Sequence, residues 1–220
     1  MLGAAALVAC GRGNGARPAE DPAGSHVSPS QAPAADERPV LLFVGTSLTA
    51  GYGLDPADAF PALVQARLDE ARLRYRVVNA GVSGETSAGA LRRIEWLLKQ
   101  PVAVLVLETG ANDGLRGQDP DATRANIEAV LERAKKQVPP PRLVLLGMEA
   151  PPNYGEEYRR RFRAIYPEMA KKNGAVLVPF LLDGVAGVAS LNQADGVHPT
   201  AEGHRRVAET VWRVLQPILS

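Results

Sequence analysis

Short apolar runs that alternate with helix-like segments constrain the fold of this chain more than any other feature. Each run is almost continuously apolar, whereas a half-exposed strand would alternate apolar and polar side chains. They are VLLFVG at 40–45, YRVVNA at 75–80, VAVLVLETG at 102–110, RLVLLGM at 142–148 and AVLVPF at 175–180. The pattern is typical of strands buried on both faces of a parallel sheet, and it predicts five of them.

Segments with the period of an amphipathic helix lie between these runs. Helices are predicted at 87–100, 121–138, 155–173 and 199–216. The second of them has aspartates near its start and lysines in its last turn, as the helix dipole favours. Alternating strands and helices predict an α/β fold in which helices cover both faces of a mostly parallel sheet, with right-handed crossovers.

The N-terminal part of the chain has a different composition. Residues 11–39 are rich in Gly, Ala, Pro and Ser and contain almost no large apolar side chains. Such a segment cannot bury enough apolar surface to offset the entropy lost on ordering. We therefore expect 11–39 to be a disordered linker and 40–220 to be the folded domain.

Residues 1–10, MLGAAALVAC, end in the single cysteine of the sequence, so no internal disulfide is expected. The run resembles the lipobox of bacterial lipoproteins, in which the cysteine is lipidated and becomes the mature N-terminus. It is too short to span a bilayer, and no basic residues precede its apolar part. The resemblance implies a truncated signal peptide, a lipidated Cys10 and a tether at 11–39. The protein would then be exported by a bacterium and be periplasmic or anchored to a membrane as a lipoprotein.

Charge and motif content argue against several classes of partner. With 25 Lys and Arg against 24 Asp and Glu, the net charge of +1 indicates no nucleic-acid partner. The one dense basic run, YRRRFR at 158–163, is interpreted as the solvated face of a helix. GVSGET at 81–86 lacks the lysine of a P-loop, and His198 and His204 would face different sides of a helix. Neither a cofactor nor a metal is expected.

The residues that follow each predicted strand are the candidates for a site, because ligands of parallel sheets bind beyond the carboxyl ends of the strands. Ser47 follows the first strand at the start of a helix, where backbone N–H groups point outward. A serine nucleophile needs a histidine base and an acid that orients this base. ADGVHPT at 194–200 supplies both, with Asp195 three residues before His198. These three residues are predicted to form a catalytic triad.

The same edge of the sheet offers donors for an oxyanion hole. We expect the backbone N–H groups of Ser47 and Gly81 and the side-chain amide of Asn112 to line it. Gly81 is chosen because a missing side chain lets the backbone approach a substrate. Asp183 is the alternative acid of the triad, although it is further from the histidine in sequence. Glu108 is expected to be paired or to face solvent.

Four sequence blocks resemble the SGNH, or GDSL-type, hydrolase family and occur in the order typical of it. They are GTSLTAGYG with Ser47, NAGVSGET with Gly81, GAND with Asn112, and DGVHPT with Asp195 and His198. The resemblance covers residues 40–219 and is closest to the branch of bacterial thioesterase I, lysophospholipase L1 and arylesterase. It implies a flavodoxin-like three-layer α/β/α sandwich with a five-stranded sheet, and metal-free hydrolysis of esters or thioesters through an acyl-enzyme.

One residue departs from the family pattern. Thr46 stands where the family usually carries aspartate. A threonine can still bond the nearby backbone, but it brings no charge. The hydrogen bonds around the nucleophile are therefore expected to differ, while the triad is expected to be retained.

Two segments are expected to wall the substrate cavity, 148–158 and 180–194. Asn153 and Tyr154 of the first segment are predicted to contact the substrate. The second, FLLDGVAGVASLNQA, is apolar, which favours an acyl chain over a sugar.

Other functions remain open at this stage. A carbohydrate O-acetylesterase could use the same triad with a more polar cavity, and a non-catalytic lipid-binding module could keep the cleft alone. A phosphate-binding receiver of the flavodoxin type would need acidic residues after the first strand, where this chain has Gly45, Thr46 and Ser47.

Overall fold

The computed structural model describes residues 36–220. The predicted signal peptide with Cys10, and nearly all of the predicted linker, lie outside the described residues. The unit from Glu37 to Ser220 is a single compact body. Its first strand begins at Val40, the residue at which the composition of the chain changes.

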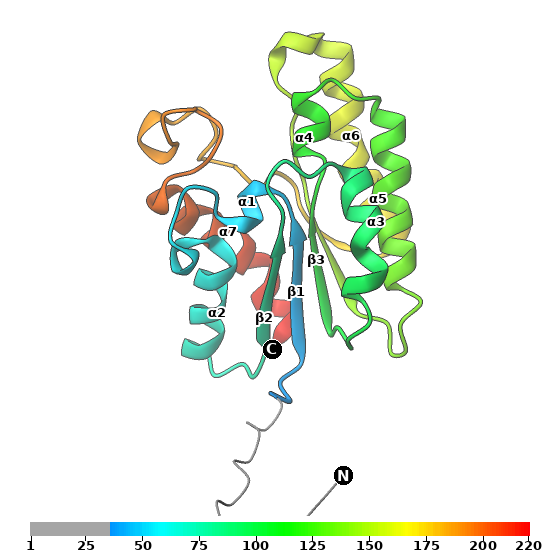
Figure 1. Ribbon diagram of the computed structural model, residues 1–220, viewed down its shortest axis with the longest axis vertical. Coiled ribbons are helices and arrows are strands. Elements are labelled where there is room, and N and C mark those ends of the chain that lie inside the picture. The colour runs from blue at the N-terminus through cyan, green and yellow to red at the C-terminus, as the bar shows by residue number, and fades with distance from the viewer. Residues whose placement is uncertain (1–35) are drawn as a thin grey trace, which may run out of the picture. The chain divides into compact units, whose positions relative to one another are not determined.

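Five parallel strands form one sheet in the order β2-β1-β3-β4-β5, so that each crossover places its helix on one face or the other (Figure 1). The five predicted strands are thus confirmed, although most are shorter than the apolar runs. Their bounds are β1 Val40–Gly45, β2 Arg76–Gly81, β3 Val104–Glu108, β4 Arg142–Leu146 and β5 Val176–Val178.

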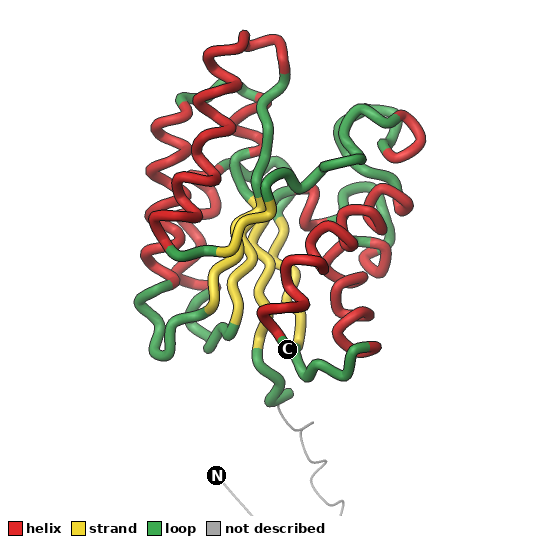
Figure 2. The backbone as a smooth tube through the Cα atoms, turned by 180° about the vertical axis from the view of Figure 1, so that it is seen from behind, coloured by secondary structure: helices red, strands yellow, loops and turns green. Residues whose placement is uncertain are grey.

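Helices cover both faces of the sheet, which gives the predicted three layers (Figures 1 and 2). On one face α3 packs against α5 and α5 against α6, and on the other α2 packs against α7. The helices are α1 Ser47–Ala50, α2 Phe60–Glu70, α3 Ser87–Leu97, α4 Ala111–Leu115, α5 Pro120–Ala134, α6 Gly155–Asn173 and α7 Ala201–Leu219. Short 3-10 turns occur at η1 Pro56–Asp58, η2 Pro152–Tyr154 and η3 Ala189–Leu191.

Helix α2 is absent from the sequence-based prediction. Its buried face is a narrow stripe formed chiefly by Phe60, Val64 and Leu68, which are spaced one turn apart. A stripe this narrow gives a weak periodic signal, because the alanines beside it fit a buried or an exposed position equally well.

The central strands are buried on both faces, as the continuous apolar runs predicted. All residues of β1 and β3 are buried, whereas the edge strand β2 is mostly half-buried. Gly45 pairs in register with Gly81, and Glu108 pairs with Leu146. The carboxyl ends of the strands therefore lie along one edge of the sheet, and the segments that follow them meet there. None of the helices in residues 36–220 is both long enough and apolar enough to cross a membrane.

Candidate active site

The turn after β1 presents Ser47 as the first residue of α1. Thr46 caps this helix, with its Oγ1 3.4 Å from the Leu48 N–H that it accepts. One turn later Gly51 ends the helix in the left-handed conformation, with φ 74°. Because α1 is so short, it has few helical hydrogen bonds, among them the bond from the Ala50 N–H to the Thr46 carbonyl at 3.0 Å, and contacts beneath it also hold its start. Ser47 itself stays half-buried at the edge of the sheet.

The loop before α7 brings a histidine and an aspartate to this serine. His198 Nε2 lies 2.9 Å from Ser47 Oγ, and His198 Nδ1 lies 2.7 Å from Asp195 Oδ2. Both distances are those of good hydrogen bonds. Residues that are 151 positions apart in sequence are thus joined in the order hydroxyl, imidazole, carboxylate. Asp183, the alternative acid, does not take part, since Asp195 occupies the other ring nitrogen.

Asp195 is held as a carboxylate by the turn that contains it. Its Oδ1 accepts the backbone N–H groups of Val197 at 2.9 Å and His198 at 3.0 Å. The His198 backbone N–H is the largest cause that keeps the Asp195 pKa well below its usual range, followed by the imidazole and by Val197. A carboxylate favours a proton on the near imidazole nitrogen, which leaves Nε2 free to accept a proton from Ser47.

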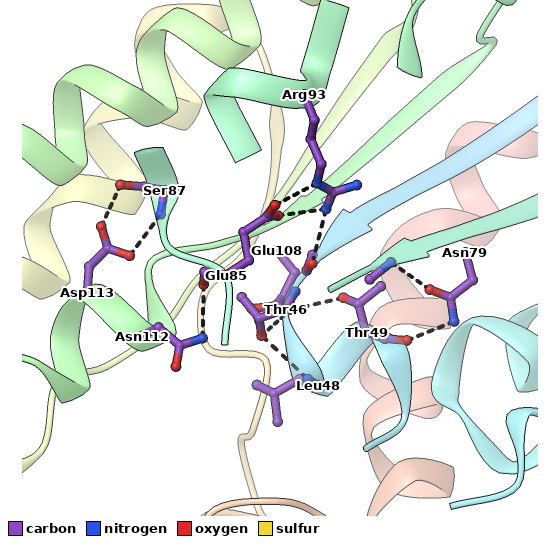
Figure 3. Close-up of polar contacts among 12 residues, drawn as sticks. Thr46, Leu48, Thr49, Asn79, Glu85, Ser87, Arg93, Glu108, Asn112 and Asp113 are labelled. Carbon is purple, nitrogen blue, oxygen red and sulfur yellow. Dashed lines mark hydrogen bonds and ion pairs between the residues drawn. The ribbon is translucent and has the colours of Figure 1, made fainter. Parts of the chain in front are cut away.

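The predicted oxyanion donors Ser47 and Asn112 both line one cavity. Asn112, at the start of α4, donates one amide hydrogen to the Glu85 carbonyl at 2.9 Å, which orients the other hydrogen of Nδ2 (Figure 3). The amide lines the same cavity as Ser47 and His198. The Ser47 N–H has no acceptor among residues 36–220, so it is also available.

Gly81 does not offer a free donor, in contrast to the prediction. Its N–H donates to Asn79 Oδ1 at 2.9 Å, and Asn79 Nδ2 in turn donates to the Thr49 carbonyl at 2.9 Å. A Cβ at Gly81 would lie 2.3 Å from the Ala50 nitrogen. This glycine is therefore needed for close packing of α1 on β2, and its N–H is already engaged.

Gly84, three residues further on, fits the role better. It has a φ of 78°, a conformation that favours glycine, and its N–H has no acceptor in the described part of the chain. Its carbonyl accepts Arg116 Nη2 at 3.2 Å, and the next carbonyl, that of Glu85, accepts Asn112. The sequence signal was present, because NAGVSGET contains two glycines and the second lies three residues before the start of α3.

The loop that carries Gly84 is fixed by two polar contacts of α3 (Figure 3). Arg93 pairs with both carboxylate oxygens of Glu85 at 2.7 Å and also reaches the Gly45 carbonyl at 3.3 Å. Ser87 donates its N–H and its hydroxyl to the buried Asp113, at 2.9 and 2.5 Å. These contacts tie the turn before Ser47 to the loop that holds Asn112.

A cavity of about 450 Å³ opens beside these groups. The two expected segments, 148–158 and 180–194, supply part of its wall, and α1, α4, α6 and the loop before α7 supply the rest. Most of the lining is apolar: Leu48, Ala111, Leu115, Met148, Ala150, Pro151, Pro152, Phe180, Leu182, Ala186 and Val197. An apolar cavity of this size, with a few polar groups at one place, is typical of a site for a small organic ligand.

Comparison with known proteins agrees with this geometry. Residues 43–206 match the GDSL-like lipase/acylhydrolase family. Esterase TesA of Pseudomonas aeruginosa is 43% identical over 180 residues, which cover 81% of this chain and 89% of TesA. Thioesterase 1/protease 1/lysophospholipase L1 of Escherichia coli K12 is 38% identical over 182 residues, covering 82% and 85%. A crystal structure of TesA superposes with a TM-score of 0.77 at 42% identity and covers 81% of this chain and 99% of the other.

The chain belongs to the GDSL-like lipase/acylhydrolase family. It is an ester-hydrolysing enzyme with the α/β SGNH hydrolase fold, as the resemblance of its four sequence blocks implied.

Within this GDSL-like hydrolase, Thr46, which departs from the family pattern, is hydrogen-bonded to a buried glutamate. Glu108, at the end of β3, is fully buried and lies beneath α1 (Figure 3). It accepts the N–H and hydroxyl of Thr46 and the hydroxyl of Thr49, at 2.7 to 3.1 Å. Burial raises the Glu108 pKa, and the bonds from Thr46 and Thr49 oppose this rise. Glu108 is thus hydrogen-bonded rather than solvent-facing.

Two predicted substrate contacts lie outside the cavity lining of this hydrolase. Tyr154 donates its hydroxyl to the Leu115 carbonyl at 2.9 Å, and its ring packs on Tyr158. Asn153 is exposed beside it. The lining instead contains Pro151 and Pro152, the residues just before them.

A residue that was not predicted from the sequence, Gln193, holds the histidine loop. It makes no hydrogen bond with a side chain of the triad, but it binds backbone carbonyls of both the histidine loop and the turn after α1. Its N–H donates to the His198 carbonyl at 2.7 Å, and its Nε2 donates to the carbonyls of Tyr52 at 2.8 Å and Pro199 at 3.0 Å. The Tyr52 ring lies 4.6 Å from the His198 ring. A polar loop residue gives no sequence signal for such a role.

Within residues 36–220, no group of three His, Cys, Asp or Glu side chains is arranged to hold a metal ion.

Proposed function

We propose that this enzyme cleaves carboxylic esters and thioesters with Ser47 as nucleophile, His198 as base and Asp195 as the residue that orients the base. The observation that carries the proposal is the pair of bonds at the His198 ring, 2.9 Å to Ser47 Oγ and 2.7 Å to Asp195 Oδ2. A serine hydroxyl is a weak nucleophile unless a base takes its proton.

The reaction proceeds in two acyl transfers. Ser47 Oγ attacks the acyl carbonyl carbon while its proton passes to His198 Nε2. The bond to the leaving alcohol or thiol then breaks as His198 returns the proton to it. Water attacks the acyl-enzyme with the same help from His198, which releases the acid and restores Ser47.

The oxyanion that forms in each step would be held by three donors. We assign the backbone N–H groups of Ser47 and Gly84 and the Asn112 amide to this role, with Gly84 in place of Gly81. The support is that neither N–H has an acceptor in residues 36–220 and that the Asn112 amide is oriented by Glu85. Donors fixed before the reaction stabilise the developing charge without reorganising.

The substrate that the cavity favours is an ester with an apolar acyl chain. Its apolar lining would gain about 25 cal/mol for each Å² of hydrocarbon removed from water. A volume of about 450 Å³ also exceeds what an acetyl group needs. We propose that the acyl chain contacts Pro151, Pro152 and Leu182. These residues replace the predicted contacts Asn153 and Tyr154.

Fluorophosphonate labelling tests the nucleophile. The wild type should label once and lose labelling in Ser47→Ala, which should also lose at least about 10⁴-fold in kcat. Ser190→Ala, at an exposed serine outside the cavity, should behave as the wild type. A Ser47→Ala enzyme that still labels, or that hydrolyses p-nitrophenyl esters at the wild-type rate, would refute the triad.

A series of p-nitrophenyl esters separates the alternatives. Rates that rise from acetate towards medium chains fit the apolar cavity. A sharp optimum at acetate would favour a carbohydrate O-acetylesterase, and binding of fatty acid without labelling would favour a lipid-binding module.

We propose further that Cys10 is lipidated and that 11–39 tethers the enzyme to a membrane after export. The support is the sequence LVAC before a segment rich in small residues and proline. Cells that express the full chain should carry the wild type in the membrane fraction and Cys10→Ser in the soluble fraction. Equal solubility of both proteins would refute the tether.

A further inference from the structure

One arginine of the basic run at 158–163 does not behave as a solvated helix face. Arg159, in the second turn of α6, lines the cavity that also contains Ser47 and His198. Its side chain is 29% exposed, whereas that of its neighbour Arg160 is 69% exposed. The phase of α6 thus turns one cation of the run towards the substrate cavity.

The hydrogen-bonding capacity of Arg159 is largely unused. A guanidinium carries five N–H donors. Nη1 pairs with Glu156 at 3.0 Å, but that carboxylate is 78% exposed, so water competes for it. Nε is buried without a partner, and Nη2 has no acceptor among residues 36–220.

The other charged wall residue away from the triad is already neutralised. Glu149 also lines the cavity, but its two oxygens bind Arg163 Nε at 3.0 Å and Nη2 at 3.1 Å. Such a two-bond pair satisfies the carboxylate and offsets its charge. Arg159 therefore dominates the electrostatics of the cavity wall away from the triad.

We infer that Arg159 forms an anion subsite, which recognises a carboxylate or phosphate group carried by the ester substrate. This inference rests on the proposed function. The planar guanidinium matches the oxygens of either group, and the apolar lining around it strengthens the attraction because it excludes water. The enzyme would then prefer substrates that combine hydrocarbon with one negative group over wholly apolar esters.

The negative group has two sources, which paired substrates distinguish. For the acyl side, the mono-p-nitrophenyl ester of suberic acid is compared with its neutral methyl ester. Shorter diacids are avoided because their free carboxylate attacks the ester internally. For the leaving-group side, 1-acylglycerol 3-phosphate is compared with 1-acylglycerol of the same chain.

The measured quantity is the ratio of kcat/KM for the charged and neutral members of each pair. In Arg159→Gln the ratio should fall by about tenfold in at least one pair, as expected for the loss of one charge-assisted hydrogen bond. Arg160→Gln is the matched control, since Arg160 forms the same kind of pair with Glu157 outside the cavity. Its ratio should equal that of the wild type. Glu156→Gln should raise the ratio, because it removes the competing carboxylate.

The inference is overturned if Arg159→Gln and Arg160→Gln give the same ratios in both pairs. Arg159→Lys keeps the charge and should retain most of the preference for the charged substrates. It replaces Arg159→Gln in the test if the glutamine variant does not fold. The two proposals fail differently. If only the subsite proposal is wrong, the enzyme still hydrolyses neutral esters and the fluorophosphonate still labels Ser47. If the triad proposal is wrong, Ser47 is never labelled.

Discussion

The carboxylate of Glu108 lies directly beneath the Thr46 backbone, with Oε2 2.7 Å from the Thr46 nitrogen. The same oxygen also accepts the hydroxyls of Thr46 and Thr49 at 2.9 Å. Ser47 follows Thr46 directly, so we expect the buried acid on β3 to position the proposed nucleophile without touching it. Thr46 stands where the family usually carries aspartate, and its hydroxyl is turned towards Glu108.

Glu108→Met should therefore harm both stability and catalysis. The variant leaves the Thr46 N–H and two hydroxyls without an acceptor, which costs about 1–3 kcal/mol of unfolding free energy for each buried group left unsatisfied. A shifted α1 should lower kcat about ten- to a hundredfold, with a smaller change in KM. Urea unfolding and p-nitrophenyl ester kinetics measure the two effects.

Glu108→Gln is the conservative partner of this variant, because its oxygen can replace Oε2. It should keep most of the activity. Burial raises the Glu108 pKa above its ordinary 4.5. The folded wild type therefore loses stability relative to Glu108→Gln as the pH rises through that raised pKa. A Glu108→Met enzyme as active as Glu108→Gln would show that the contact does not position Ser47.

Thr46→Asp restores the residue usual in the family but places a second carboxyl against Glu108. Two adjacent carboxylates cannot both ionise cheaply, so the pair should hold a proton in the folded state. Stability should then fall as the pH rises from 5 to 8, by more than in Thr46→Asn, the uncharged control of the same shape. Urea unfolding at the two pH values measures this, and parallel behaviour of both variants would contradict it.

The main parts of the candidate triad could be predicted because the topology of the sheet brings them to the same edge. Ser47 and His198 lie far apart in sequence, yet each follows the carboxyl end of a strand. In a parallel sheet those ends meet at one edge. Residue type and position relative to a strand were enough, and no contact between side chains had to be known.

The residues that sequence reasoning missed depend on such contacts. Gly81 and Gly84 are equally plausible donors until it is known that Asn79 occupies the first N–H. Arg159 and Arg160 are adjacent arginines on one helix, and the phase of α6 decides which of them lines the cavity. The first choice depends on a side-chain contact two residues away, and the second on how α6 is turned towards the cavity, so residue type alone predicts neither.

Arg93 should be a positioning residue for the oxyanion loop, because it joins Glu85 to the Gly45 carbonyl. Arg93→Met leaves the Glu85 carboxylate, 9% exposed, without its partner. We expect a loss of about 1–3 kcal/mol in unfolding free energy and a fall in kcat with little change in KM. The exposed neighbour variant Arg92→Met should change neither quantity. Arg93→Lys should restore part of kcat. Equal kcat in the wild type, Arg93→Met and Arg93→Lys would refute the positioning role.

The buried His204 should make the fold sensitive to acid. Its Nδ1 accepts the Phe60 N–H at 3.1 Å, which requires the neutral ring, and its ring stacks on the Phe60 ring. Burial lowers the His204 pKa from 6.5 to about 4, which the nearby Asp58 opposes and His198 reinforces. Because the unfolded chain takes up this proton first, stability should decline as the pH falls below 6.5 and continue to decline towards 4.

Urea unfolding at pH 7.5 and 4.5 measures this decline. The wild type should lose about 2 kcal/mol more than His204→Asn over this range, since each unit of pKa shift is worth about 1.4 kcal/mol. The asparagine keeps an acceptor for Phe60 but cannot titrate. His198→Gln is the matched control, because it removes a histidine outside the core. It should leave most of the acid sensitivity in place, since burial, and not His198, is the largest cause of the lowered His204 pKa. If His204→Asn loses stability as steeply as the wild type, the sensitivity has another source.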